Sequence, residues 1–307
     1  MRAVQWDSYG GVDVLGVRDV ADPVPGAGQV RVRVRAAGLN PGEAKIRAGE
    51  FREMFPATFP SGEGTDFAGT VDAVGDGVDA FAVGDEVLGW TDERASHAEL
   101  VVVPDTQLTG KPAGLPWEVA GSLFVAGTTA LAAVDAVAPG PGDLVAVAGA
   151  AGAVGSLAVQ LVLLRGAKAI GIAGAANQQW VGELGAVPVD YSAGELAELL
   201  AAAADGQPID GFIDTVGGPY VDLALELGVS PDRVDTIANL RAASEKGVKR
   251  DGNAQGASAE NLALVAAMVA DGRLELSVAR TYPLDDVRAA YEELETGHVR
   301  GKLVLIP

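Results

Sequence analysis

The sequence predicts an α/β protein with two parts, and two features of its 307 residues support this. From residue 1 to about residue 116, short segments rich in valine and alternating residues are separated by glycine and proline, which is typical of a β-rich, barrel-like unit. After Trp117, strands alternate with helices, which is typical of a parallel sheet covered by helices on both faces. We expect two domains, because a single hydrophobic core rarely serves a chain of this length.

Composition and charge exclude several classes of function. Asp and Glu outnumber Lys and Arg by 42 to 22, and the net charge of -20 argues against nucleic-acid and membrane-surface binding. The absence of cysteine excludes disulfides, a thiolate nucleophile and cysteine-ligated zinc. His97 and His298 are the only histidines, so a histidine-rich metal site is excluded as well. We therefore expect no metal, no nucleic-acid partner and no membrane partner.

Two segments bear on the location of the protein. The N-terminus carries a charge at Arg2 and has no apolar stretch before a small-residue cleavage site, so we expect no secretory signal and a cytoplasmic protein. Residues 144–164 are uncharged over the length of a membrane span. We interpret them as a buried strand, a glycine turn and a buried helix, which would be equally apolar.

The expected elements follow from the local patterns. In the first part, strands are predicted at residues 30–38, 67–75, 85–90 and 98–104, with turns at Asp22-Pro23 and Pro25-Gly26. One long apolar helix is predicted at residues 117–138, and it ends at Pro139-Gly140. Strands are then expected at 143–149, 169–174, 187–191, 211–218 and 233–239, and helices at 154–166, 177–185 and 195–204. The last part predicts a helix at 260–272, a strand at 276–284, a helix at 286–297 and a closing strand at 302–307.

The strongest chemical signal is a glycine motif at a predicted strand-to-helix junction. Gly149, Gly152 and Gly155 form the pattern G-x-x-G-x-x-G. Small residues are needed there because a pyrophosphate must approach backbone N–H groups at a helix N-terminus without an intervening side chain. The motif predicts dinucleotide binding, with a tight packing turn as the alternative. The residues between the glycines belong to the same predicted site: Ala150, Ala151, Ala153 and Val154.

The end of the second expected strand bears on which nicotinamide is bound. A NAD site usually has Asp or Glu about 20 residues beyond the motif, to hold the ribose 2′-OH. This chain has Gly174, Ala175 and Asn177 in that region, without a carboxylate and without an Arg or Lys to attract a 2′-phosphate. NADP is therefore favoured, and an ordinary loop without a discriminating residue is the alternative.

Several segments, taken in order, carry a resemblance to one protein family: YGGVDVL, AAGLNPGEAKIRAG, GTDFAGTVDAVG, VGDEVLG, ASHAELVVVP, VAGTTALAA, AGAAGAVGSLAVQL, FIDTVGG and GHVRGKLVLIP. The chain resembles the medium-chain dehydrogenase/reductase superfamily, in its zinc-independent quinone oxidoreductase (zeta-crystallin-like) branch. The resemblance implies a GroES-like β-rich catalytic domain at residues 1–120, completed by 258–307, and a Rossmann doubly wound parallel-sheet domain at 121–257. It also implies an active site in the cleft between the domains, and a homodimer.

The resemblance implies a reaction as well. Zinc alcohol dehydrogenases carry Gly-His-Glu where this chain has Gly64, Thr65 and Asp66, so zinc activation of an alcohol is not expected. The family then implies hydride transfer from NADPH to a small-molecule quinone or α,β-unsaturated carbonyl (enone). The alternatives are an enoyl-thioester reductase of a biosynthetic pathway and a non-catalytic NADPH-binding protein.

Two residues are expected to be catalytic on the strength of the family pattern. Lys45 stands where the alkenal/enone reductase subgroup has a lysine, and an ammonium group there would stabilise a developing enolate. The alternative for Lys45 is an exposed surface lysine. Asn40 resembles the family asparagine beside the nicotinamide, with a turn-forming Asn-Pro as the alternative. Glu43 is expected to be a structural partner of Lys45 or Arg47.

The remaining cofactor candidates lie on several expected elements. The family pattern places Thr129 in a helix that approaches the cofactor and Arg300 in the closing motif, whereas back-bonding and a solvated charge are their alternatives. Val216, Gly217 and Ala238 lie at the carboxyl ends of expected strands, at the edge of a parallel sheet where ligands bind. Asp214 is expected to be a turn or cap residue. The aromatic residues after Asn40 are expected either to roof an apolar pocket or to pack in the core: Phe51, Phe55 and Phe59, with Met54.

Overall fold

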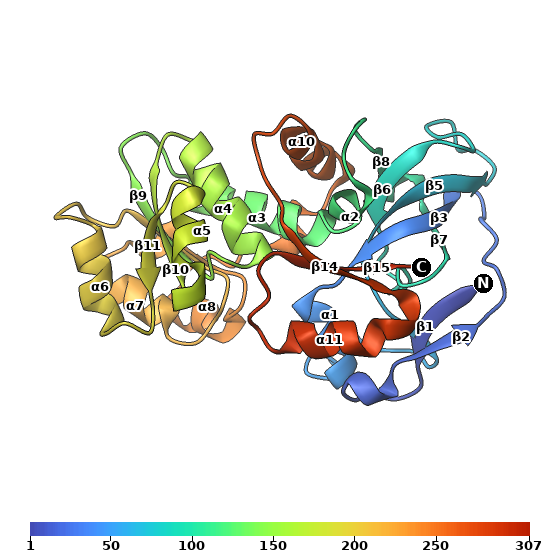
Figure 1. Cartoon of the computed structure of the whole chain (residues 1–307), viewed down its shortest axis with the longest axis horizontal. Coiled ribbons are helices and arrows are strands. Elements are labelled where there is room, and N and C mark those ends of the chain that lie inside the picture. The colour runs from blue at the N-terminus through green and yellow to red at the C-terminus, as the bar shows by residue number, and fades with distance from the viewer. The chain divides into compact units, whose positions relative to one another are not determined.

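The computed structural model describes residues 1–307, which divide into two compact units. The first unit comprises Met1–Val125, Ser258–Arg273 and Ser277–Pro307. The second comprises Ala126–Ala257 and Leu274–Leu276. Figure 1 labels most elements of both units, and the strands of the first unit come from both ends of the chain.

The first unit is built on two β-sheets. The larger has the spatial order β14 (Val278–Pro283), β15 (Lys302–Ile306), β3 (Gln29–Gly38), β5 (Asp66–Val74), β6 (Glu86–Trp90) and β8 (Leu108–Gly110), and β7 (Leu100–Pro104) pairs with β3. The smaller has the order β2 (Gly16–Asp19), β1 (Arg2–Trp6) and β4 (Ser61–Gly62). Because β15 pairs with β3, the last strand of the chain lies in the same sheet as residues 29–38.

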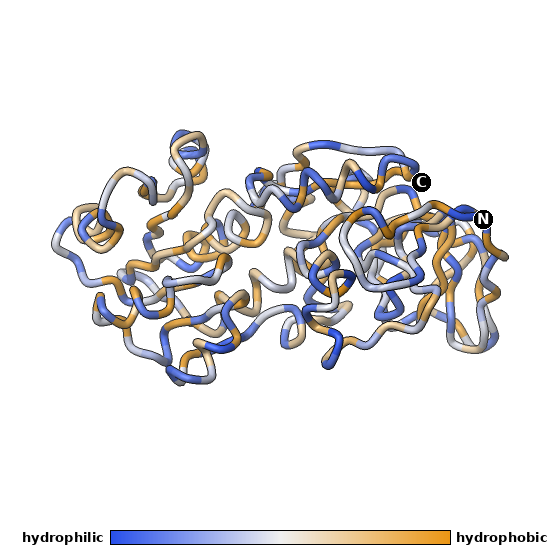
Figure 2. Tube along the Cα trace, turned by 90° about the horizontal axis from the view of Figure 1, so that it is seen from below, coloured by the Kyte–Doolittle hydropathy of each residue, from blue (hydrophilic) through white to orange (hydrophobic).

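The alternation along β3 explains why this unit folds as it does. Val30, Val32 and Val34 are buried, whereas Arg33 and Arg35 on the other face are exposed. A strand that hides one face and solvates the other needs this period of two. Figure 2 shows apolar and polar stretches alternating along the chain of this unit.

Helices also belong to the first unit, and the expectation of β segments alone up to residue 116 is incomplete. Helix α1 (Pro41–Ala48) follows β3, while α10 (Ala259–Ala270) and α11 (Val287–Glu295) come from the C-terminal part. Proline at the first position of α1 and Gly49 at its end, with a φ of 84°, are ordinary start and stop signals. Helix α1 was not predicted, although these signals lie inside the segment AAGLNPGEAKIRAG.

The prediction of one helix at residues 117–138 is wrong. The segment forms α2 (Trp117–Ala120) and α3 (Phe124–Val137), separated by three residues. The Gly38 N–H donates to the carbonyl of Gly121 at 2.7 Å, and a Cβ on Gly121 would lie 2.3 Å from the carbonyl oxygen of Ala36. Close contact with β3 therefore interrupts the helix, and the Val125 N–H donates instead to Asp66 Oδ1 at 3.1 Å.

The second unit has a five-stranded parallel sheet. Its spatial order is β11 (Val187–Asp190), β10 (Lys168–Ala173), β9 (Leu144–Ala148), β12 (Gly211–Asp214) and β13 (Val234–Thr236). Every residue of β9 is buried, as expected for a central strand covered on both faces. After β9, the chain adds β10 and β11 on one side of it and then β12 and β13 on the other side. The strand order therefore reverses between β9 and β12.

Most of α3, from Ala126 onward, belongs to the second unit. The other helices of this unit are α4 (Ala153–Leu164), α5 (Gln178–Glu183), α6 (Leu196–Ala203), α7 (Tyr220–Glu226), α8 (Leu240–Lys246) and α9 (Asn253–Gly256). The expected helices near 154–166, 177–185 and 195–204 are confirmed. Helix α7, which links β12 to β13, was not predicted, and neither were α8 and α9.

The apolar segment 144–164 forms strand β9, the glycine turn and helix α4, as interpreted from the sequence. None of the helices combines the length and apolar character that crossing a bilayer requires.

Candidate functional site

The loops at the carboxyl ends of the parallel strands bring most of the predicted cofactor residues to one edge of the second unit. Gly149 follows β9, Gly174 follows β10, Val216 follows β12 and Ala238 follows β13. In open parallel sheets, ligands bind at this edge, beside the point where the strand order reverses. That point lies between β9 and β12, so the glycine loop and residues 215–217 flank it.

The glycine loop is shaped by contacts that exclude side chains. Gly149 has a φ of 76°, and a Cβ on it would lie 2.4 Å from Thr215 Oγ1. A Cβ on Gly155 would lie 2.1 Å from the carbonyl oxygen of Gly149. Both glycines are therefore required by the fold itself, which supports the packing interpretation for these two positions.

Gly152 differs from the other two glycines. It is the N-cap residue of α4, with φ and ψ of -75° and 168°, and the nearest atom to an added Cβ is 3.4 Å away. The fold therefore leaves room for a side chain that the sequence does not supply. The first N–H groups of a helix lack intrahelical partners and attract anions. The residues at this end of α4 thus fit a dinucleotide pyrophosphate.

Asp214 organises the loops that follow β12 and β13. Its Oδ1 accepts hydrogen bonds from the N–H groups of Val216 and Gly217, at 2.9 and 2.8 Å. Its Oδ2 accepts one from Thr236 Oγ1 at 2.7 Å. The expectation that Asp214 is a turn or cap residue is confirmed. Thr236 was missed, because only the register of β12 and β13 places it beside Asp214.

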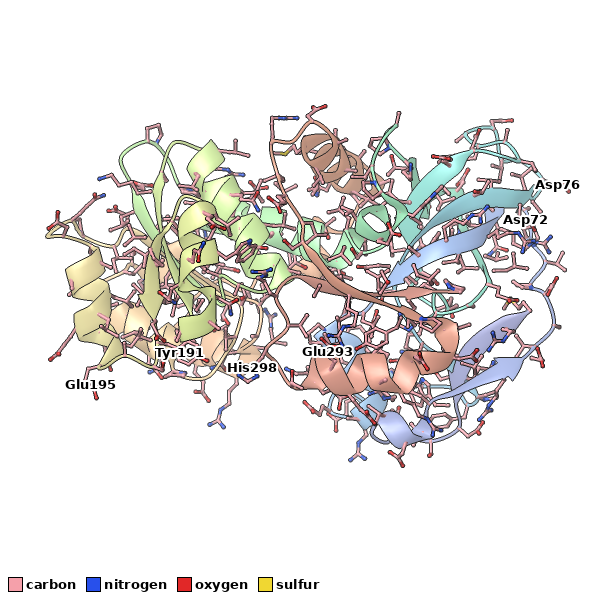
Figure 3. All side chains as sticks on the ribbon, viewed as in Figure 1. Asp72, Asp76, Tyr191, Glu195, Glu293 and His298 are labelled. Carbon is pink, nitrogen blue, oxygen red and sulfur yellow. The ribbon has the colours of Figure 1, made fainter.

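The loop after β10 has no acidic side chain of its own. Gly174 is followed by the short turn that contains Ala175 and Asn177, and Gln178 Nε2 donates to the carbonyl of Ala173 at 2.9 Å. Tyr191, labelled in Figure 3, lies against this loop, because a Cβ on Gly174 would be 3.3 Å from its hydroxyl oxygen. Tyr191 is 46% exposed and was missed, although it is the last residue of the strand expected at 187–191.

Thr129 lies in α3, and the part of α3 that contains it belongs to the second unit. Its side chain is buried, and its methyl carbon would lie 3.8 Å from a Cβ on Gly252. The neighbouring Thr128 Oγ1 accepts a hydrogen bond from Asn253 Nδ2 at 3.0 Å. The threonine pair therefore packs against the start of α9, at residues 252–253, and the cofactor role of Thr129 stays a prediction.

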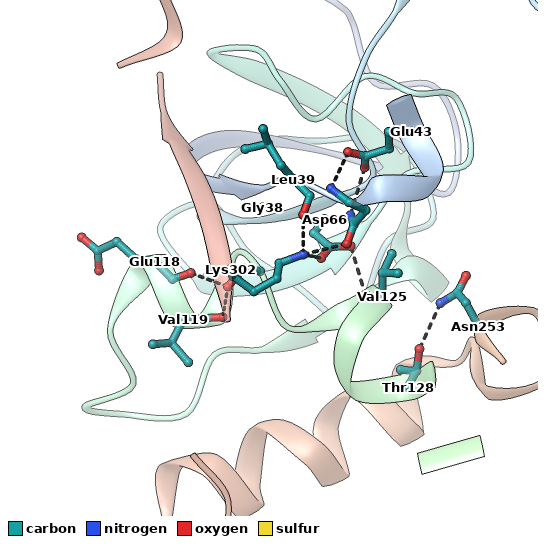
Figure 4. A network of polar contacts seen from close by, with 12 residues as sticks. Gly38, Leu39, Glu43, Asp66, Glu118, Val119, Val125, Thr128, Asn253 and Lys302 are labelled. Atoms are coloured by element: carbon teal, nitrogen blue, oxygen red, sulfur yellow. Dashed lines mark hydrogen bonds and ion pairs between the residues drawn. The ribbon is translucent and has the colours of Figure 1, made fainter. Parts of the chain in front are cut away.

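In the first unit, Asn40 belongs to a buried polar network with Glu43 and Lys302, which Figure 4 labels. Its Nδ2 donates to Glu43 Oε1 at 3.0 Å, and its Oδ1 accepts from Lys302 Nζ at 2.6 Å. Lys302 Nζ also donates to the carbonyl of Leu39 at 2.8 Å and contacts Asp66 Oδ2 at 3.3 Å. Both polar ends of the Asn40 side chain are thus engaged within the unit, which supports a helix-starting and positioning role. A catalytic role for Asn40 stays a prediction.

Arg47 is the second cation of this buried region. Its Nη1 contacts Glu63 Oε1 at 3.1 Å, and its Nη2 contacts Glu295 Oε1 at 2.6 Å. Tyr291 lies beneath the guanidinium, which is 4.4 Å from the ring centroid. The expectation that Glu43 pairs with Lys45 or Arg47 is wrong, because Glu43 bonds to Asn40 and accepts from the Tyr291 hydroxyl at 2.8 Å.

Burial shifts the pKa values of the ionisable groups here. Burial raises the pKa of Glu63 to about 8 and that of Asp66 to about 6, while Arg47 and Lys302 oppose these shifts. Burial lowers the pKa of His97, whose Nε2 lies 3.3 Å from the Gly38 carbonyl oxygen. His97 is 1% exposed, and the fold packs Gly64 against its ring. These contacts support a structural histidine rather than a proton donor.

Lys45 lies on the exposed side of α1, whose buried residues are Glu43 and Arg47. Arg300 is exposed in the segment between α11 and β15. Nothing in their own unit tests the roles predicted for Lys45 and Arg300, which stay predictions. Among the aromatic residues, Phe59 packs with Trp6 and Tyr9 at ring-centroid distances of 5.4 and 5.3 Å.

The loop at residues 51–59, which contains these aromatic residues and Met54, is only partly packed. Met54 and Phe55 are 60% and 45% exposed, so core packing does not account for them. The Ala57 N–H donates to the Tyr9 hydroxyl at 2.9 Å and anchors the loop at its far end.

Two family models match the chain. The model for the alcohol dehydrogenase GroES-like domain matches residues 26–114, and the model described as zinc-binding dehydrogenase matches residues 184–305. The second description names zinc, whereas no group of three or more His, Asp or Glu side chains is arranged to hold a metal ion. The GroES-like plus Rossmann fold predicted from the sequence is confirmed.

Relatives of known name match over the full length. The chain is 30% identical to the chloroplast envelope quinone oxidoreductase homolog of Arabidopsis thaliana, over 100% of this chain and 98% of that protein. Among solved structures, the quinone oxidoreductase of Coxiella burnetii has a TM-score of 0.91 and 31% identity, with 100% and 99% of the two chains covered. The Escherichia coli quinone oxidoreductase, solved in complex with NADPH, has a TM-score of 0.87 and 27% identity, with both chains fully covered.

Proposed function

We propose that this chain is an NADPH-dependent reductase. The chain belongs to the zinc-independent quinone oxidoreductase branch of the medium-chain dehydrogenase/reductase superfamily. Its proposed substrates are quinones or α,β-unsaturated carbonyl compounds. The catalytic role of the GroES-like part, residues 1–120 with 258–307, and the cofactor role of residues 121–257 belong to the same proposal.

The observation that carries this proposal is the shape of the glycine loop. Gly149 and Gly155 are fixed by packing, whereas Gly152 has room for a side chain and nevertheless has none. An open glycine at the N-cap of a twelve-residue helix, at the edge where the strand order reverses, is the arrangement that a dinucleotide pyrophosphate needs.

The preference for NADPH rests on the loop after β10. A 2′-phosphate is repelled by a carboxylate at this position, and Gly174, Ala175 and Asn177 provide none. The nearby Asp190 directs its Oδ1 to the N–H and hydroxyl of Ser192, at 2.9 and 2.7 Å. Tyr191 follows β11, and its hydroxyl lies against the loop after β10, where it is able to donate to a phosphate oxygen.

When bound, a reduced nicotinamide supplies a hydride to the acceptor, and a proton must be delivered to balance the charge. For an enone, the hydride adds to the β-carbon, and the negative charge that develops on the carbonyl oxygen needs a donor. We assign this role to the ammonium group of Lys45, which α1 presents on its exposed side. The buried contacts of Asn40 with Glu43 and Lys302 hold the start of that helix in place.

The experiment that tests the function compares NADPH and NADH oxidation by the purified protein. The acceptors are a para-quinone, a short-chain enone and an enoyl-coenzyme A. We expect turnover with the quinone or the enone and a higher kcat/KM with NADPH. Turnover with the enoyl-coenzyme A alone would identify an enoyl-thioester reductase, and binding of NADPH without any turnover would indicate a non-catalytic protein.

The proposed assembly is a homodimer in the cytoplasm, by analogy with the family. Sedimentation at micromolar concentration tests the first part of this proposal. A dimer is expected, and a monomer would contradict it.

A further inference from the structure

Two adjacent loops of the predicted cofactor edge are tied to one buried pair of side chains. Asp214 ends β12 and Thr236 ends β13, and the two residues are partners in the register of the parallel strands. Both are fully buried. The pair therefore lies beneath the loop of residues 215–218 and the loop of residues 237–239, and is not part of the exposed surface that a ligand meets.

The hydrogen bonds of the pair leave little freedom. Asp214 Oδ1 accepts from the N–H groups of Val216 and Gly217, so it fixes the first loop. Thr236 Oγ1 accepts from the N–H groups of Ala238 and Asn239, at 3.3 and 3.0 Å, so it fixes the second. Because this hydroxyl has a single hydrogen, which it donates to Asp214 Oδ2, the two sets of bonds form one network.

A second contact joins the same loops. Asn239 Nδ2 donates to the carbonyl of Gly218 at 3.0 Å, and Asn239 Oδ1 caps α8 by accepting from the N–H of Ala242 at 3.1 Å. Gly217 has a φ of 91°, and a Cβ on it would lie 3.4 Å from the Ala238 carbonyl oxygen. The loops therefore contact each other above the pair, and displacement of one disturbs the other.

These hydrogen bonds require a carboxylate at position 214 and a hydroxyl at position 236. An amide in place of the Asp214 carboxyl group would direct a donor at Thr236 Oγ1, which already accepts two N–H groups, and would leave the hydroxyl hydrogen without an acceptor. Valine in place of Thr236 keeps the shape but leaves two N–H groups and one carboxyl oxygen without partners.

We propose that Asp214 and Thr236 are a positioning pair that couples these two loops, so that each holds the other in the arrangement that binds the nicotinamide cofactor. The part of this inference that concerns the cofactor rests on the proposed function. The coupling of the loops is a property of the protein alone and is measurable without a ligand.

The first test is residue-resolved amide hydrogen exchange in the free protein. In Thr236→Val, the amides of Ala238 and Asn239 lose their acceptor, whereas those of Val216 and Gly217 keep Asp214 Oδ1. Coupling predicts at least ten-fold faster exchange at Val216 and Gly217 as well. Unchanged exchange at these two amides would show that the bonds act only locally, and would overturn the proposal.

The second test is NADPH affinity, followed by the fluorescence of the reduced nicotinamide. Thr236→Val and Asp214→Asn are each expected to weaken binding about ten-fold, and the double variant little more, because both remove the same coupling. Thr236→Ser, which keeps the hydroxyl, should restore affinity. Losses that add in the double variant, or unchanged affinity in both single variants, would overturn the proposal.

A matched control separates positioning from general stability. Asp143 lies at the opposite edge of the same sheet, where its Oδ2 accepts from the Gly140 N–H at 2.9 Å and contacts Arg233. Asp143→Asn should lower the unfolding midpoint and leave NADPH affinity unchanged. If the wild-type protein binds no NADPH, the proposed function fails, and the exchange measurement alone decides on the coupling.

Discussion

The two units both bury polar groups, but they use them differently. In the first unit, charged side chains from distant parts of the sequence meet one another, as Lys302 meets Asp66 across 236 positions. In the second, Asp214 bonds to backbone N–H groups two and three residues away and to the hydroxyl of a neighbouring strand. The first arrangement joins segments of the chain into one scaffold, whereas the second shapes loops. We therefore expect substitutions in the first network to act mainly on stability and those in the second on ligand affinity.

The largest effect is expected from Lys302→Met in the first unit. The change leaves Asp66, Asn40 and the Leu39 carbonyl without their shared donor in a buried site, and loss of one partner of a buried pair costs ~3–5 kcal/mol. The unfolding free energy is measured by urea titration followed by circular dichroism.

Lys246→Met is the matched control, because Lys246 contacts Asp222 at 2.7 Å while both side chains are about half exposed. Its urea midpoint should equal that of the wild-type protein within error. Equal losses from the two lysine substitutions would contradict the contrast between buried and surface pairs. If Lys302→Met does not fold, Asp66→Asn supplies a milder version, since the amide keeps an acceptor oxygen for Lys302.

The next effect concerns catalysis rather than stability. Lys45→Ala should lower kcat by about a hundred-fold or more, since an oxyanion donor contributes ~2.7–4 kcal/mol. Its urea midpoint should not change, because Lys45 is exposed. Arg35→Ala removes an exposed cation from β3 and should keep full activity. Wild-type kinetics in Lys45→Ala would remove Lys45 from the mechanism.

The glycine loop offers a comparison within the second unit. Gly155→Ala forces a Cβ to within 2.1 Å of a backbone oxygen and should reduce both stability and NADPH affinity. Gly152→Ala meets its nearest atom at 3.4 Å and should reduce NADPH affinity by about ten-fold while the urea midpoint stays the same. Fluorescence titration with NADPH measures the affinity, and urea titration measures the stability. Full affinity in Gly152→Ala would show that the pyrophosphate lies elsewhere.

The last effect is a pH dependence from Asp235 in the second unit. Burial raises the pKa of Asp235 to about 7, since its Oδ1 accepts only from the Asp251 N–H and its Oδ2 has no partner. The folded state therefore holds a proton on Asp235 that the unfolded state releases near pH 4. The stability that this proton contributes is fully present below about pH 4 and is lost as the pH rises to 7. It should amount to about 1–3 kcal/mol.

The measurement is the urea midpoint of the wild-type protein and of Asp235→Asn between pH 5 and pH 8. The difference between them should move in favour of the variant as pH rises, because the neutral amide cannot ionise. A difference that does not change with pH would assign an ordinary pKa to Asp235.

The sequence predicted the elements whose signals are local. The alternation of β3, the strand β9 and the glycine loop were predicted because each depends on residues next to one another in the chain. The break between α2 and α3 was not, because it comes from contact of Gly121 with Ala36 and Gly38, more than 80 positions away.

The same reason explains what was missed at the candidate site. Nothing near Lys302 or Arg47 in the sequence indicates that they are buried beside Asp66 and Glu63. Asp214 was recognised as a turn residue from its position after a strand, but its partner Thr236 lies on another strand and became apparent only with the register of the sheet.

The most direct test of the account is acceptor-dependent oxidation of NADPH by protein dialysed against a metal chelator. We predict that a para-quinone or a short-chain enone stimulates NADPH oxidation, and that chelation leaves the rate unchanged. Oxidation that is abolished by the chelator and restored by zinc, or no stimulation by either acceptor in protein that binds NADPH, would contradict the account.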